Sequence, residues 1–329
     1  MTVQIIAEVG SVHDGSFGNA CKLVEAAAAC GVDAVKFQTH IAEAETLASA
    51  PSPGYFTAEP RIAYFERTAF TPEQWHELKS VCDRNQVTFL SSPFSLEAVA
   101  LLEDVGAESY KIPSGEVTNL PLLERVAATG KPCLLSSGMS DWAELDRAVE
   151  VLRAGGPLTV LQCSSLYPCP AEQVGLNVLG ELRTRYGTAV GYSDHSRGLT
   201  AAVAAVALGA TVIEKHFTFS RLMYGSDASN ATEPAAFARL VEMIRECEAM
   251  LAHPVDKDET TAYREMKRIF EKSVVTAGPI AAGTVLTATD LAFKKPGDGI
   301  SAARYRELVG RRAARDLPAD HQLSPSDLS

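Results

Sequence analysis

The sequence predicts an α/β protein, a (β/α)8 barrel followed by a small β-rich domain. Eight short apolar segments alternate with helical stretches over roughly the first 250 residues, which is the usual size of such a barrel. Parallel strands need a crossover between them, usually a helix, so this alternation indicates a parallel sheet. A doubly wound open sheet is the alternative. It is disfavoured because residues 10–15, after the first strand, match neither glycine-rich phosphate motif.

The predicted strands are runs rich in Val, Ile, Leu and Phe, at residues 3–8, 34–38, 87–91, 109–112, 133–136, 158–162, 189–191 and 211–216. The predicted helices cover residues 19–30, 96–105, 120–128, 142–153, 173–186, 198–208 and 233–251, and one more begins after Thr71. Thr71, Ser95 and Asp141 are good N-cap residues. A long loop containing PSPG at 51–54 joins the second strand to Thr71, and its aromatic residues at 55, 56, 64 and 65 are interpreted as loop packing.

Composition sets the domain organisation and excludes some partners. We predict a catalytic barrel at 1–252, a charged linker at 253–272 and a small domain at 273–329. The formal charge of −11 without a basic stripe argues against nucleic acid. No apolar run is long enough to span a membrane, and the N-terminus lacks the features of a signal peptide. Seven cysteines without a CxxC pair predict free thiols in a reducing cytoplasm.

Polar side chains stand at the carboxyl end of every predicted strand, where barrel enzymes place their active sites. His195 and His216 follow neighbouring strands. Two imidazoles so placed could bind one divalent metal ion such as Mn, Zn or Fe, or they could form a hydrogen-bonded pair at the rim. Their spacing fits both interpretations.

Two strand lysines, Lys36 and Lys111, point to an anion site. Ammonium groups supply charge, and hydroxyl groups supply hydrogen bonds, to a phosphate or carboxylate. The hydroxyl groups belong to serines 92, 114, 136, 164 and 193. The alternative is that each lysine pairs with a glutamate inside the barrel. The candidate carboxylates, as general bases or as ion-pair partners, are Glu8, Glu116 and Glu214.

Longer motifs carry a resemblance to a known family. IAEVGSVHDG, DAVKFQ, FLSSPFSLEAV, YKIPSGEVTNLPLL, LLSSGM, LQCSSLYP, GYSDHSRG and GATVIEKHFT occur in this order. Together they resemble the sialic acid synthase family, which includes the N-acetylneuraminate, legionaminic and pseudaminic acid synthases. The C-terminal stretch from TAGPIAAGTVL to FKKPGDGIS is similar to that family's antifreeze-like (SAF) domain. The resemblance spans nearly the whole chain.

The resemblance implies a metal-dependent condensation of phosphoenolpyruvate with an open-chain sugar aldehyde, usually an N-acylhexosamine. The products are a nine-carbon 2-keto-3-deoxy acid and phosphate. The metal is expected to be Mn²⁺, with Mg²⁺ or Co²⁺ as alternatives, and two chains are expected to form a domain-swapped homodimer.

The same resemblance implies roles for individual residues. The metal ligands are His195 and His216. The phosphoenolpyruvate site consists of Lys111, Ser114, Ser136, Ser193, Ser92 and Ser165. The sugar side consists of Lys36, Gln38, Tyr167, Asp227 and Lys295. The catalytic carboxylates are Glu8, Glu214 and Glu116, of which Glu116 activates water.

Several positions depart from the family pattern. The family usually has Asn at Asp14, Thr at Ser92, Asp at Ser95, His at Gln162, and Pro-Gly-Pro-Asp at residues 224–227. The SAF-domain arginine corresponds to Lys295, which cannot provide a bidentate fork. These changes predict a retained phosphoenolpyruvate half and an acceptor other than ordinary N-acetylmannosamine. Two further hypotheses are a different metal-dependent barrel aldolase or lyase, and a non-catalytic sugar-binding protein.

Overall fold

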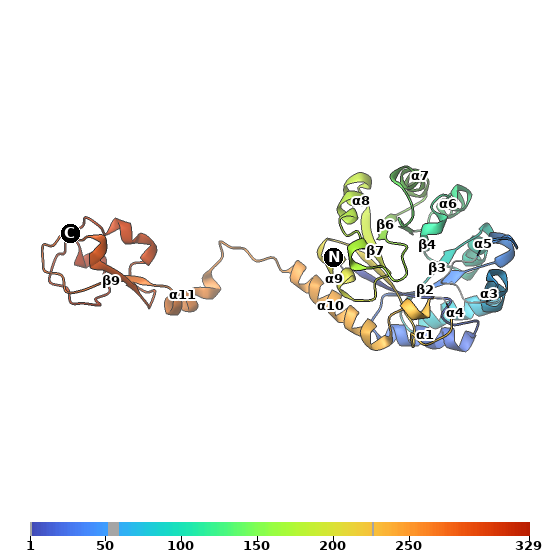
Figure 1. Cartoon of the computed structure of the whole chain (residues 1–329), viewed down its shortest axis with the longest axis horizontal. Coiled ribbons are helices and arrows are strands. Elements are labelled where there is room, and N and C mark those ends of the chain that lie inside the picture. Colours follow the sequence, from blue (N-terminus) through green and yellow to red (C-terminus); the bar gives the residue numbers. More distant parts are fainter. Residues whose placement is uncertain (1, 52–58, 226) are drawn as a thin grey trace. The chain divides into compact units, whose positions relative to one another are not determined.

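The structure, a computed structural model, describes residues 2–51, 59–225 and 227–329. The chain divides into two compact units, residues 1–253 and 254–329 (Figure 1). The first unit is the barrel, which carries all the predicted site residues except Lys295. Each unit is described by itself.

Eight parallel strands close into a barrel in sequence order, with β8 pairing with β1. The prediction of a (β/α)8 fold is therefore confirmed. The strands are β1 (Gln4–Gly10), β2 (Ala34–Thr39), β3 (Thr88–Pro93), β4 (Tyr110–Ile112), β5 (Cys133–Ser136), β6 (Leu158–Cys163), β7 (Ala189–Asp194) and β8 (Val212–His216).

Helices follow the strands and surround the barrel (Figure 1). They are α1 (Phe17–Ala29), α2 (Ala42–Glu45), α3 (Arg61–Thr68), α4 (Pro72–Arg84), α5 (Leu96–Val105), α6 (Leu120–Ala127), α7 (Trp142–Arg153), α8 (Val178–Tyr186), α9 (Thr200–Ala207) and α10 (Pro234–Ala252). Short 3-10 turns are η1 (Ser114–Glu116), η2 (Ala171–Gln173) and η3 (Ala228–Asn230).

Local capping explains where several helices begin. Thr71 forms a capping box with Gln74, and Asp141 forms one with Glu144. Backbone N–H groups at the helix start, which have no partner within the helix, are therefore hydrogen-bonded to side chains. Ser95 accepts a hydrogen bond from the N–H of Ala98 at 3.0 Å and caps α5. Serine therefore performs the capping that the family's aspartate could perform at this position.

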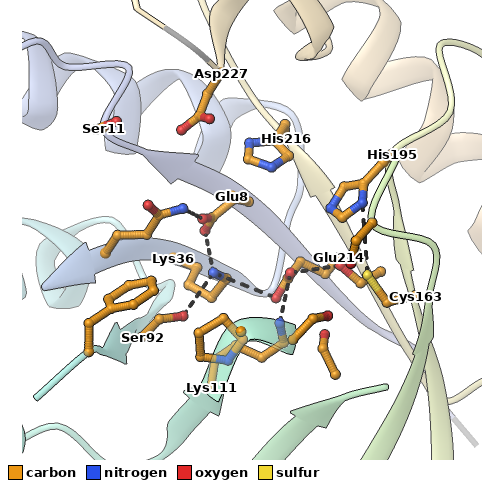
Figure 2. Close-up of a pocket in the computed structure, with 18 of the residues that line it drawn as sticks. Glu8, Ser11, Lys36, Ser92, Lys111, Cys163, His195, Glu214, His216 and Asp227 are labelled. Atoms are coloured by element: carbon orange, nitrogen blue, oxygen red, sulfur yellow. Dashed lines mark hydrogen bonds and ion pairs between the residues drawn. The ribbon is translucent and has the colours of Figure 1, made fainter. Parts of the chain in front are cut away.

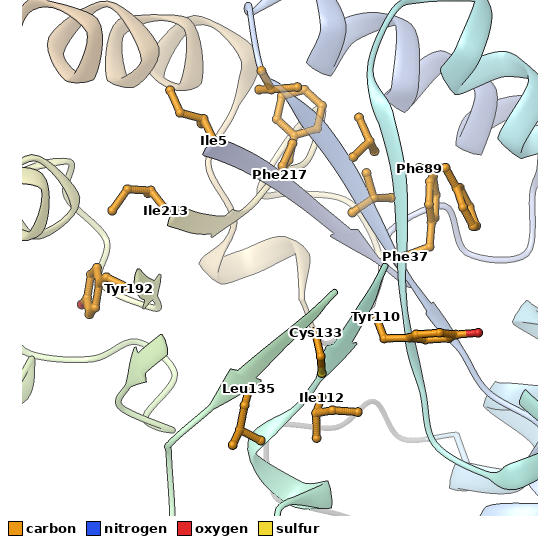
Figure 3. Packing of buried hydrophobic residues seen from close by; sticks show 14 of the residues in the cluster. Ile5, Phe37, Phe89, Tyr110, Ile112, Cys133, Leu135, Tyr192, Ile213 and Phe217 are labelled. Atoms are coloured by element: carbon orange, nitrogen blue, oxygen red, sulfur yellow. The ribbon is translucent and has the colours of Figure 1, made fainter. Parts of the chain in front are cut away.

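Side chains alternate in direction along each strand, and this alternation gives two separate apolar layers, one outside the barrel and one inside it. Ile5, Phe37, Tyr192 and Ile213 point outward and pack in the core between strands and helices (Figure 3). Their neighbours in sequence point into the barrel, because successive strand residues face opposite sides. The inward apolar layer consists of Ile6, Ala34, Leu90, Leu134, Leu161 and Val212. Two residues further along each strand the inward layer turns polar, with Glu8, Lys36, Ser92, Ser136, Cys163 and Glu214.

Two sequence predictions about connections are wrong. The region between β2 and Thr71 contains α2 and α3, so Tyr64 and Phe65 lie on a helix and not in a loop. Residues 52–56 of that region lie outside the described residues. The predicted helix at 173–186 is in fact a 3-10 turn followed by α8, because Gly175 adopts a φ of +69° and interrupts the helix.

The second unit contains a short exposed helix near its start and continues as a small β-rich module. The helix, α11 (Arg264–Phe270), follows the turn η4 (Thr261–Tyr263) and buries none of its residues within the unit. The antiparallel strands β9 (Ser273–Thr276) and β10 (Leu291–Lys294) pair with each other. Three turns complete the unit, η5 (Ala288–Asp290), η6 (Ala302–Glu307) and η7 (Pro325–Asp327).

The core of this module is small and apolar, with Val274, Leu286 and Leu317 among its members. No helix within the described ranges is long and apolar enough to cross a membrane.

Candidate active site

A cavity of about 270 Å³ opens at the carboxyl ends of the strands (Figure 2). It is where the polar inward layer meets the loops after the strands. Of the predicted site residues, those that line it are Glu8, Lys36, Gln38, Ser92, Lys111, Ser114, Ser136, Ser165, Tyr167, Ser193, His195, Glu214, His216 and Asp227.

Four buried charges form the floor of the cavity. Lys36 Nζ lies 2.8 Å from Glu8 Oε2 and 3.9 Å from Glu214 Oε2, and Lys111 Nζ lies 3.2 Å from Glu214 Oε1. Figure 2 shows these side chains converging from four different strands. The lysine–glutamate ion pairs, which were the alternative to an anion site, are therefore present. They lie inside the same cavity that an anion site would need.

Glu214 is the centre of this network. Besides its lysine partners, it accepts a hydrogen bond from Ser193 Oγ at 3.0 Å. Burial alone would raise the pKa of Glu214, but the ammonium groups of Lys111 and Lys36 outweigh burial and hold that pKa well below its usual range. Glu214 is therefore an anion at physiological pH, and it neutralises part of the lysine charge.

Serine hydroxyl groups converge beside Lys111. A Cβ atom at Gly138 would lie 2.3 Å from Ser165 Oγ and 2.7 Å from Ser114 Oγ, so any larger residue would fill this space. Ser136 Oγ is buried and has no hydrogen-bond partner among the described residues. An unpaired buried hydroxyl is costly unless a ligand satisfies it. These groups, together with Lys111, form a cradle suited to a small anion.

The two predicted imidazoles face each other across one side of the cavity. The ring centroids of His195 and His216 are 5.7 Å apart. Two imidazoles that share one ion at a metal–nitrogen distance of about 2.1 Å have centroids no more than about 6.6 Å apart. The observed separation therefore permits a shared ion. No group of three or more His, Cys, Asp or Glu side chains in the described ranges is arranged to hold a metal.

The hydrogen bonds of the imidazoles suit metal ligands. His195 Nδ1 lies 2.8 Å from the Ser164 carbonyl oxygen and donates to it, which leaves the Nε2 lone pair facing Tyr167 Oη at 3.0 Å. His216 Nδ1 is buried without a partner among the described residues. Burial lowers the pKa of His216, in opposition to Asp227 and Glu8, and so favours the neutral, ligating form.

Cys163 lines the cavity beside His195, a position that sequence analysis did not assign to the site. Burial alone would raise the pKa of its thiol. His195, whose Nδ1 lies 3.8 Å from Sγ, and Lys111 outweigh burial and lower this pKa to about 7. The signal in the sequence was its place at the end of β6, two residues beyond the inward-facing Leu161.

We expect iodoacetamide to alkylate Cys163 in the metal-free protein at a rate that rises as pH increases through about 7, because the thiolate is the nucleophile. Peptide mass mapping of a pH series measures this rate. Cys82 and Cys133 are the internal controls, since burial raises the pKa of each thiol to about 12. Modification of Cys163 that begins only above pH 9 would contradict the assigned environment.

Two predicted residues do not line the cavity. Glu116, on η1, accepts a hydrogen bond from Asn119 Nδ2 at 2.7 Å, and this contact turns its carboxylate toward the start of α6. Burial is the main cause of its raised pKa. Lys295 belongs to the second unit, where its Nζ lies 4.8 Å from the ring centroid of Phe270.

Two departures from the family pattern have structural explanations outside the cavity. Gln162 points outward from β6, accepts from Ser137 Oγ at 3.2 Å and donates to the Val174 carbonyl at 3.1 Å. Asp14 adopts a φ of +53° and pairs with Arg67 at 2.8 Å, an ion pair that asparagine could not make. These two changes therefore alter supporting contacts and do not contact an occupant of the cavity.

The fold and site define a barrel protein with an anion cradle and an imidazole pair at the mouth of its barrel. Comparison with known proteins gives the family. The NeuB family model matches residues 23–256, and the SAF domain model matches residues 271–329. The chain therefore belongs to the NeuB family and ends in a SAF domain.

Individual relatives agree with this assignment. The chain is 37% identical to N,N'-diacetyllegionaminic acid synthase of Campylobacter jejuni, over 97% of this chain and 98% of the relative. It is 32% identical to human N-acetylneuraminate-9-phosphate synthase, over 97% and 90% of the two chains. The crystal structure of N-acetylneuraminic acid synthetase from Leptospira borgpetersenii superposes with a TM-score of 0.73 at 29% identity, covering 81% of this chain and 90% of that one.

Proposed function

We propose that the protein condenses phosphoenolpyruvate with the aldehyde of an open-chain, N-acylhexosamine-like sugar, giving a 2-keto-3-deoxy sugar acid and phosphate. The observation that carries the proposal is the buried cavity of a NeuB-family barrel, in which an anion cradle adjoins a lysine–glutamate network. Phosphoenolpyruvate carries a phosphate and a carboxylate, and the cradle supplies the cation and hydroxyl groups that both anions need.

Lys111 and the serines of the cradle would hold phosphoenolpyruvate, while Gln38, Tyr167 and Asp227 would contact the sugar. Both reactants then share one cavity, so the reaction between them is effectively intramolecular. Carbon 3 of phosphoenolpyruvate forms a bond to the aldehyde carbon, and positive charge develops at carbon 2. The Glu8 and Glu214 carboxylates lie within the cavity and stabilise that charge. Water then adds to carbon 2, and the tetrahedral intermediate expels phosphate.

Glu116 is the residue that the family resemblance identifies as the base that activates the attacking water. Its raised pKa allows the carboxyl group to accept a proton and to hold it. It stands on the same short turn as Ser114, at the edge of the cradle. Lys295 would act on the acyl group of the sugar from the SAF domain of a second chain.

The proposal includes a divalent ion held by His195 and His216, with Mn²⁺ as the first candidate. Two observations support it: His195 donates through Nδ1, so that its Nε2 lone pair faces the cavity side at Tyr167 Oη, and His216 Nδ1 has no hydrogen-bond partner among the described residues. When bound, the ion would act as a Lewis acid on the aldehyde oxygen of the sugar.

We also propose that two chains associate, with the SAF domain of one over the barrel mouth of the other. Large apolar side chains on the loops after the strands are exposed, among them Leu47, Met139 and Leu222. Helix α11 also exposes Met266, Ile269 and Phe270. The formal charges differ, −12 for residues 1–253 and +1 for residues 254–329, and this difference favours such contact. Exposed apolar patches of this kind are usually covered in an assembly.

Release of phosphate from phosphoenolpyruvate in the presence of Mn²⁺ and a panel of N-acylhexosamines tests the function. We expect release that depends on both the sugar and the ion, together with a 2-keto acid product seen by mass spectrometry. A lyase or aldolase would turn over without phosphoenolpyruvate, and a sugar-binding protein would bind the sugar without releasing phosphate. Absence of phosphate release with every sugar would contradict the proposal.

A further inference from the structure

One wall of the cavity is a stack of planar side chains that the family resemblance does not assign. His40 lies between Phe65 and Phe94, with ring centroids 3.9 and 4.1 Å away and interplanar angles of 14° and 22°. Arg61 Cζ lies 5.4 Å from the centroid of Phe65. All four side chains line the cavity. They come from the loops after β2 and β3 and from α3.

Hydrogen bonds hold this stack in place. His40 Nδ1 lies 2.8 Å from Glu45 Oε1, and His40 Nε2 lies 3.1 Å from Gln38 Oε1. Gln38 Nε2 in turn donates to Glu8 Oε1 at 2.7 Å. The stack is therefore joined through Gln38 to the Glu8–Lys36 ion pair, and its position relative to the reacting centre is fixed.

Arg61 is a cation without a carboxylate partner in this wall. No Asp or Glu oxygen of the described residues lies within ion-pair distance, and its Nε atom is buried without a hydrogen-bond partner among them. The residues outside the described ranges, 1, 52–58 and 226, include no Asp or Glu. Glu116 acts on Arg61 only through its more distant charge. A guanidinium group that faces a cavity with spare donors is a site for an anion.

The cradle beside Lys111 already provides for both anionic groups of phosphoenolpyruvate. The Arg61 wall is joined to the other half of the cavity, through Gln38, a residue proposed to bind sugar. We infer that Arg61 binds a phosphate monoester at the end of the acceptor sugar remote from its aldehyde. This inference rests on the proposed function and names its substrate class, a phosphorylated sugar aldehyde.

The test compares matched acceptors with the full-length protein. The probes are several 2-acetamido-2-deoxyhexoses and their 6-phosphates, used with wild-type protein and Arg61→Met. The readouts are kcat/KM for formation of the 2-keto acid, and calorimetric binding of each sugar in the absence of phosphoenolpyruvate. Arg147→Met is the matched control, since Arg147 lies exposed on α7, outside the cavity, and its loss changes the net charge equally.

We expect wild-type protein to prefer phosphorylated acceptors by about 10- to 100-fold, the range typical of a charge-assisted hydrogen bond. Arg61→Met should reduce that preference to near unity, and Arg147→Met should leave it unchanged. An equal loss of kcat/KM with phosphorylated and unphosphorylated acceptors would overturn the inference. Arg61 would then act on Glu116 or on phosphoenolpyruvate and not on the acceptor sugar.

A wild-type preference for unphosphorylated sugars would also overturn the inference. Absence of product with every sugar would instead be a failure of the proposed function. In that case the binding measurement alone tests the role of Arg61. Sugar phosphates should still bind more tightly than their parent sugars to wild-type protein, whereas Arg61→Met should bind both with equal affinity.

Discussion

His216→Ala is expected to lower Mn²⁺-dependent formation of product by about 10³-fold or more, since loss of Lewis-acid stabilisation costs several kcal/mol of barrier. His216 stands at the end of β8, and its Nδ1 has no hydrogen-bond partner among the described residues, so its removal breaks no internal hydrogen bond at that atom. The free energy of unfolding should change by no more than about 1 kcal/mol. Initial rates over a Mn²⁺ series, with Mn²⁺ binding followed by electron paramagnetic resonance, measure the effect.

The control for this prediction is His76→Ala. His76 lies exposed on α4 and pairs with Asp104, outside the cavity, so its loss should alter neither Mn²⁺ affinity nor rate. A His216→Ala protein that binds Mn²⁺ and turns over within threefold of wild type would remove the metal role from this residue.

Lys111→Met is expected to raise KM for phosphoenolpyruvate by about 100-fold, the upper range for a lost hydrogen bond to a charged group. KM for the sugar should change by less than about threefold, because Lys111 lies in the cradle for the other reactant. Steady-state kinetics with each substrate varied in turn provide the comparison. Equal effects on both KM values would argue against the cradle.

The variant also tests the buried ion pair. Lys111 and Glu214 are both buried, and removing one partner of such a pair typically costs about 3–5 kcal/mol of stability. Glu214→Gln in the Lys111→Met background should recover part of this loss, as followed by thermal unfolding, because the carboxylate that lost its nearer lysine is then replaced by a neutral amide. Lys79→Met, at an exposed pair with Asp83 on α4, should alter neither stability nor KM appreciably.

The barrel and most of its site could be predicted from local sequence because both depend on local patterns. Strand and helix types follow from apolar periodicity and from capping residues such as Ser95 and Thr71. In a closed parallel barrel all strand ends meet at one rim. The sequence therefore predicts that Glu8, Lys111 and Glu214, which lie at such ends, come together.

The tertiary structure decided which face each side chain uses and how the loops fold back. Gln162 and Cys163 are adjacent at the end of β6, yet only Cys163 enters the cavity, since neighbouring strand residues face opposite sides. Glu116 stands three residues from Pro113, a lining residue, but its carboxylate accepts a hydrogen bond from Asn119 and is not part of the cavity lining.

The amino-acid sequence by itself determined the barrel, the domain order and the rim that carries the polar residues, because each follows from contacts between near neighbours in the chain. The stacking of Phe65 and Phe94 on His40, and the position of the Arg61 guanidinium over Phe65, depended on packing between segments distant in sequence. Such packing is set by the folded chain as a whole, and no local pattern of residues specifies it.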